Sequence, residues 1–113
     1  MSHIIVKNLI NSNIAVSMPL GDKLYKELIK VWDENNTIKI DFINIDTYAT
    51  PFFNASIGRL LKDHTIDELK QKLSFEHLSE GGYNLLNRVI SNAIAFYENP
   101  EPIIQLVNTN VEE

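Results

Sequence analysis

The sequence contains no cysteine among its 113 residues. Disulfide bonds, thiol catalysis and thiolate metal sites are therefore excluded, and the composition is compatible with a reducing cytosol. Long apolar runs are also missing, since the first apolar stretch is interrupted by Lys7 and Asn8 and is too short for a signal peptide or a membrane span. We therefore expect a cytoplasmic protein that makes no use of a membrane.

Basic residues are few and scattered. Ten Lys and Arg stand against fifteen Asp and Glu, which gives a formal charge of -5 and a pI near 5.1. Proteins that bind a phosphate backbone concentrate positive charge on one surface, and no such cluster occurs here. Nucleic acid is therefore not an expected partner.

Recognisable ligand motifs are absent as well. His3, His64 and His77 have none of the spacings of metal ligands, so we expect ordinary surface or strand-end histidines, with no metal and no cofactor. Gly81 and Gly82 are not followed by Lys-Ser or Lys-Thr, so they do not form a phosphate-binding loop. They are expected at the entry to the last helix.

The length and composition predict a single domain. The chain has 113 residues, of which 44% are hydrophobic and 22% charged, so it can build one core and no second domain. We place this domain at residues 1–99 and expect a C-terminal tail at residues 100–113.

Hydrophobic periodicity predicts the elements of the first half. Residues 3–10 and 14–18 are rich in β-branched side chains and flank a polar turn, which predicts two strands in a hairpin. Residues 19–34 change to a helical period. The nearly continuous apolar run at residues 38–46 then predicts a central strand that is reached through a right-handed crossover.

The second half continues the alternation of helices and strands. A helix opens at Thr50-Pro51, and Thr65 with Glu68 forms the capping box of a short helix. Residues 72–78 predict a strand with imperfect alternation, and residues 79–99 predict the longest helix. The element order is β-β-α-β-α-α-β-α, which predicts an α/β fold with a small mixed four-stranded sheet.

Three segments carry a family resemblance: IKIDFINIDTYATPFFNASIGRLL, then LSFEHLS, then LLNRVISNAIAFY. Their order and spacing over residues 39–97 resemble the STAS fold of anti-sigma-factor antagonists, and more closely a STAS-like family of unknown function from bacteria and phages. The resemblance implies a regulatory protein–protein interaction domain, not an enzyme.

The resemblance also implies a site. In the antagonists, a strand leads into an Asp-Ser-Ser-Gly turn, and the first serine is phosphorylated by a partner kinase that is also the anti-sigma factor. When Asp41 is aligned with the strand aspartate, Thr50 falls on the phosphorylated serine, while Ala49, Pro51 and Phe52 replace the other three residues. The resemblance therefore implies a partner-binding surface and candidate phospho-switch at Thr50, Phe52, Asn54 and Ser56.

Two interpretations of this turn stay open. Thr50 is favoured as a helix N-cap with Pro51 in the first helical position, which needs no function. The alternative is a phosphorylation switch, in which Phe52 decides part of the outcome: an exposed Phe52 would anchor a partner, whereas a buried Phe52 would mark a helix start only.

Two functions follow from these patterns. The first is a STAS-like regulator that binds a protein partner, such as an ATPase of the histidine-kinase type. The alternative is a small phage or host-defence interaction protein that uses the fold as a homodimeric scaffold. An enzyme is the least favoured, because no nucleophile has a base and an orienting group, and Asp41 and Asp46 are expected on opposite faces of a strand. We expect Asp41 to be a strand-end or solvated residue.

The tail offers a route to self-association. Pro100 and Pro102 end the last helix, and the following apolar segment, residues 103–107, is too hydrophobic for a free end. We expect this segment to form an edge strand of its own sheet or, with slight preference, to pair with a second copy in a homodimer.

Overall fold

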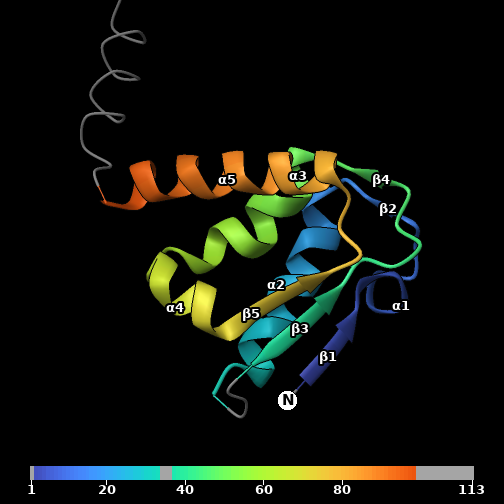
Figure 1. Ribbon diagram of the computed structural model, residues 1–113, viewed down its shortest axis with the longest axis horizontal. Helices are drawn as coiled ribbons and strands as arrows, with labels where there is room; N and C mark the ends of the chain where they lie inside the picture. Colours follow the sequence, from blue (N-terminus) through green and yellow to red (C-terminus); the bar gives the residue numbers. More distant parts are fainter. Residues whose placement is uncertain (1, 34–36, 99–113) are drawn as a thin grey trace, which may run out of the picture.

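The computed structural model describes residues 2–33 and 37–98. Strands and helices alternate along the chain in an α/β arrangement (Figure 1). The elements in order are β1 Ser2–Ile5, α1 Val6–Ile10, β2 Ile14–Ala15, α2 Met18–Val31, β3 Ile38–Asp41, β4 Thr47–Tyr48, α3 Thr50–Phe53, a π-helical turn Asn54–Gly58, α4 Ile66–Lys72, β5 Leu73–Glu76 and α5 Glu80–Glu98.

The strands within the described residues form two small parallel sheets. The main sheet has three strands in the order β1-β3-β5, and the second sheet pairs β2 with β4. The prediction of a central strand is confirmed, because β3 lies between β1 and β5. The expected mixed sheet of four strands is not what these residues form, since every pairing is parallel.

The hairpin predicted at the start of the chain is wrong. The strand ends at Ile5, and Val6–Ile10 form one short helix that is closed by Asn11 in the left-handed conformation with φ 54°. Val6 and Ile10 are four residues apart, so a helix turns both into the core, where they are 0% and 3% exposed. Burial of this pair outweighs the β propensity of the segment.

Several helical predictions are confirmed. Ser17 caps α2 by accepting a hydrogen bond from the Leu20 amide, and Thr65 with Glu68 forms the capping box of α4. The last helix follows β5 and supplies buried Leu86 and Val89 to the core. The predicted tail at residues 100–113 lies outside the described residues. None of the described helices combines the length and apolar character that a membrane span requires.

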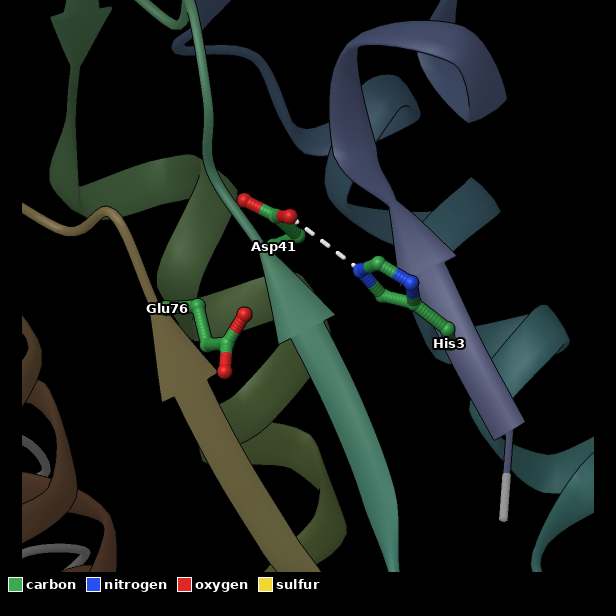
Figure 2. Close-up of side chains that lie close together, drawn as sticks. All are labelled: His3, Asp41 and Glu76. Carbon is green, nitrogen blue, oxygen red and sulfur yellow. Dashed lines mark hydrogen bonds and ion pairs between the residues drawn. The ribbon is translucent and has the colours of Figure 1, made fainter.

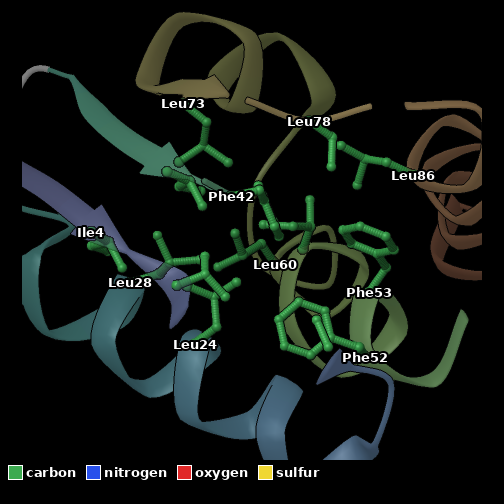
Figure 3. Packing of buried hydrophobic residues seen from close by; sticks show 14 of the residues in the cluster. Ile4, Leu24, Leu28, Phe42, Phe52, Phe53, Leu60, Leu73, Leu78 and Leu86 are labelled. Carbon is green, nitrogen blue, oxygen red and sulfur yellow. The ribbon is translucent and has the colours of Figure 1, made fainter. Parts of the chain in front are cut away.

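One face of the main sheet is buried and the other is polar. Ile4 points to the core formed with α2, α3 and α5 (Figure 3), and Ile38 and Ile40 of β3 are buried in the same core. The opposite face carries the alternate residues of the same strands, and in Figure 1 none of the described helices crosses in front of it. Its side chains include His3, Lys39, Asp41, Ser74 and Glu76.

Candidate functional site

Thr50 begins α3 but does not cap it. The N-cap is Ala49, which is still extended at φ -146° because its amide donates to the carbonyl of Ala15 at 3.1 Å and prolongs the β2–β4 pairing. No side-chain hydrogen bond caps this helix, so the predicted capping role of Thr50 is wrong. The side chain is half-buried and reaches the surface.

Two of the other residues predicted for this site are buried. Phe52 is 0% exposed and packs edge-on against Phe53 with 5.6 Å between ring centroids (Figure 3). Ser56 is also 0% exposed, and its hydroxyl donates to the carbonyl of Phe52 at 2.8 Å. The interpretation of Phe52 as an exposed anchor is therefore wrong. Asn54 is exposed, so Thr50 and Asn54 remain at the surface.

Exposed apolar side chains lie on two elements that adjoin the start of α3. Ile14 on β2 is 45% exposed and pairs in register with Thr47, and Met18, the first residue of α2, is 64% exposed. Gly21, one turn after Met18, lies against Phe52, so α2 and α3 begin close together (Figure 1). We call Ile14, Met18, Thr50 and Pro51 the helix-start surface.

A second group of polar side chains gathers on the open face of the main sheet. Asp41 is only 5% exposed, and its Oδ2 lies 3.1 Å from Nε2 of His3 (Figure 2). Its Oδ1 lies 2.8 Å from Nδ1 of His77 and accepts the amide of Ile43 at 3.0 Å. Together with Glu76 these side chains form what we call the Asp41 cluster, namely His3, Asp41, Glu76 and His77.

The sheet register assembles this cluster. β1 pairs Ile5 with Asp41, and β5 pairs Glu76 with Asp41, so side chains from three neighbouring strands share one face. His77 follows β5 with φ 57°, a left-handed conformation that is uncommon for histidine. Sequence spacing could not find the cluster, because His3 and His77 are 38 and 36 residues from Asp41.

Asp41 is an ionised carboxylate in neutral solution. Its burial alone would raise the pKa, but hydrogen bonds from His77, the Ile43 amide and His3, together with the charge of His77, outweigh burial and lower the pKa of Asp41 below its ordinary value of 3.8. Because a carboxylate only accepts hydrogen bonds, both imidazole nitrogens that face it act as donors. Asp41 was expected to be a strand-end or solvated residue; it is the last residue of β3, which confirms the first alternative, and its burial shows that it is not solvated.

His64 is not part of this cluster, whereas a lysine lies beside the cluster. Lys39 lies 3.4 Å from Glu76 on the same face, which adds a positive charge beside the cluster. His64 instead packs against Trp32, with 4.4 Å between ring centroids, and its Nδ1 lies 3.5 Å from Glu68. Of the three histidines, His3 and His77 alone contact Asp41.

Comparison with known proteins gives one family. A family model described as a STAS-like domain of unknown function matches residues 21–83, more than half of the chain. The matched range includes Thr50, Asp41 and His77, but not His3, Ile14 or Met18. Searches of curated proteins and of solved structures found no match. The resemblance to a STAS-like family of unknown function is confirmed.

Proposed function

The chain belongs to the family of STAS-like domains of unknown function, and on that premise we propose that it is a non-enzymatic regulatory domain that binds another protein. The partner class we propose first is an ATPase of the histidine-kinase type, as in the anti-sigma-factor antagonists. The observation that carries the proposal is the helix-start surface, which combines exposed Ile14 and Met18, on elements that adjoin the start of α3, with half-buried Thr50.

The helix-start surface has the composition of a small protein contact. Ile14 and Met18 expose apolar atoms that lose contact with water when a partner covers them. Methionine is unbranched and adapts to irregular partner surfaces. Asn54, four residues after Thr50 and exposed, adds a hydrogen-bonding group near the edge of this surface.

Thr50 is the proposed point of regulation. A phosphate on this hydroxyl would stand on the first residue of α3, where the helix dipole favours negative charge. The same phosphate would add about two negative charges to a surface that also exposes apolar Ile14 and Met18. We propose that phosphorylation releases the partner by making this apolar contact unfavourable.

The histidines of the described residues bond to carboxylates. Within residues 2–33 and 37–98, no serine or threonine hydroxyl is hydrogen-bonded to an imidazole, since the hydrogen bonds of His3 and His77 go to Asp41 and that of His64 goes to Glu68. A hydroxyl nucleophile with an adjacent base is therefore not formed by these residues.

Partner capture with matched variants tests the proposal. The protein is used as bait in an extract of its own host, and a captured ATPase is purified and its affinity for the bait measured. Met18→Asp is expected to lower this affinity more than tenfold, whereas Ile29→Asp, at an equally apolar position that is 43% exposed further along α2, leaves it unchanged. Equal affinities of the two variants would contradict this surface.

The switch has its own readout. Thr50→Glu is expected to weaken the purified complex with the fold preserved, while Thr50→Ser leaves it intact, and intact-mass spectrometry of protein from its host is expected to detect a phosphate. A complex that tolerates Thr50→Glu, together with unmodified protein, would remove the switch. A dimer in light scattering with no captured partner would favour the homodimeric scaffold instead.

A further inference from the structure

We propose that His3, Asp41 and Glu76 form a binding site for a divalent transition-metal ion of the zinc type, with His77 as a positioning residue. One ligand atom from each of the three side chains lies within 4.8 Å of the other two (Figure 2). The three ligands come from β1, β3 and β5, so each strand of the main sheet contributes one.

The donor set fits zinc chemistry. Zn²⁺ binds imidazole nitrogen and carboxylate oxygen at about 2.0–2.2 Å, so two ligands of one tetrahedral ion lie roughly 3.3 Å apart. Nε2 of His3 and Oδ2 of Asp41 are already separated by 3.1 Å. Binding of the ion to this pair requires that Nε2 of His3 loses its proton to the other ring nitrogen or to solvent and turns its lone pair to the metal.

Hydrogen bonds behind the ligands hold Asp41 in place. Its Oδ1 accepts from the Ile43 amide and from Nδ1 of His77, which leaves Oδ2 directed at His3. Ligating carboxylates in proteins are commonly oriented by such outer contacts. His77 makes its contact with Asp41 from a left-handed backbone conformation, with φ 57°.

The site is open to solvent on one side. The side chains of His3 and Glu76 are 47% and 37% exposed, whereas Asp41 is 8% exposed, so an ion can enter without opening the core. Three protein ligands leave a coordination position for water or for a side chain of another molecule. The ion would also add positive charge beside two carboxylates, which is favourable.

Lys39 competes with the metal for Glu76. Its ammonium lies 3.4 Å from the Glu76 carboxylate and must move away when an ion binds there. Replacement of Lys39 by glutamine is therefore expected to tighten metal binding. A structural ion-pair network predicts no such gain, so this variant separates a metal site from a set of surface ion pairs.

This site is independent of the proposed partner surface. The Asp41 cluster lies on the open face of the main sheet, while Ile14 and Met18 lie at the start of β2 and α2. Met18→Asp is therefore expected to leave metal affinity unchanged, and failure of either proposal does not decide the other.

Calorimetric titration of the tag-free, chelator-treated full chain with Zn²⁺ tests the site. One ion per chain is expected, and Co²⁺ is expected to give the absorption bands of a four- or five-coordinate N/O site. His3→Ala and Glu76→Gln are expected to lower the affinity more than tenfold, and His77→Ala about tenfold, within the range typical of an outer-contact loss. His64→Ala is the matched control and leaves the affinity unchanged.

Circular dichroism of each variant serves as the control for folding. Glu76 is the most informative position, because it is half-buried and its replacement disturbs little packing. The proposal is overturned if the wild-type chain takes up no stoichiometric Zn²⁺, or if Glu76→Gln and His64→Ala have the same affinity. A Lys39→Gln variant that binds no more tightly than wild type would exclude Glu76 as a ligand.

Discussion

Gly21 on α2 lies directly against the carbonyl oxygen of Phe52 on α3. A Cβ atom at position 21 would overlap that oxygen and lie 2.9 Å from Cβ of Ala55. A backbone oxygen cannot turn aside as a flexible side chain can, so any larger residue forces the two helices apart. Because Met18 and Thr50 begin these same helices, this contact also sets the shape of the helix-start surface.

Gly21→Ala is therefore expected to destabilise the protein despite the higher helix propensity of alanine. Overpacking of this kind lowers the free energy of unfolding by about 1–3 kcal/mol. Gly81→Ala is the control, since a Cβ there meets only the Ser79 hydroxyl at 3.9 Å. Urea denaturation of both variants measures the difference in the free energy of unfolding. Equal midpoints would show that α2 and α3 can move apart without loss of stability.

The two threonines at helix starts are expected to respond differently to replacement by alanine. Thr65 accepts the Glu68 amide at 3.1 Å within a capping box, so Thr65→Ala is expected to lower the free energy of unfolding by about 1 kcal/mol. Thr50 makes no capping bond, so Thr50→Ala is expected to change it by less than about 0.5 kcal/mol. Denaturant titration checks both values, and a larger loss at Thr50 would restore its capping role.

Local patterns predicted the elements that have a clear apolar face. The helix α2 and the long α5 bury one stripe each, and β3 is apolar enough to be central, so periodicity alone identifies them. The pairing of strands depends on distant segments. Local sequence therefore could not show that β2 pairs with β4, or that the chain after Ile5 turns into a helix.

The sites were predictable only in part. Thr50 was found at a helix start, but strand pairing through Ala49 moves the cap by one residue. Phe52 lies off the stripe formed by Phe53 and Ile57, yet α2 covers its side of α3, so Phe52 is buried as well. The Asp41 cluster is formed by side chains from three strands. The hydrophobic periodicity of each segment does not predict which strands lie side by side.

The predicted tail gives a test of self-association. Residues 100–113 lie outside the described part of the chain, and the expectation of strand exchange rests on the apolar segment 103–107 after two prolines. Deletion of the residues after Glu101 is expected to convert a dimer into a stable, folded monomer, as measured by light scattering. An unchanged dimer would contradict exchange through the tail, and loss of folding would favour packing on its own domain.

The capping box of α4 predicts a pH dependence of stability. Glu68 accepts the Thr65 amide at 2.9 Å and faces His64, and these contacts lower the pKa of Glu68 below its ordinary value of 4.5. The folded chain therefore binds the proton of Glu68 less readily than the unfolded chain, so this contribution to stability is present above about pH 4.5 and is lost as the pH falls through the lower folded pKa. Carboxyl-resolved NMR titration is expected to place the titration midpoint of Glu68 below 4.5. His64→Gln is expected to raise this midpoint only in part. The Thr65 amide is the larger cause of the lowered pKa, and that variant retains it. Between about pH 6 and 3 the wild type is expected to lose more thermal stability than Glu68→Gln, and parallel losses would show that the capping carboxylate is not ionised preferentially in the folded state.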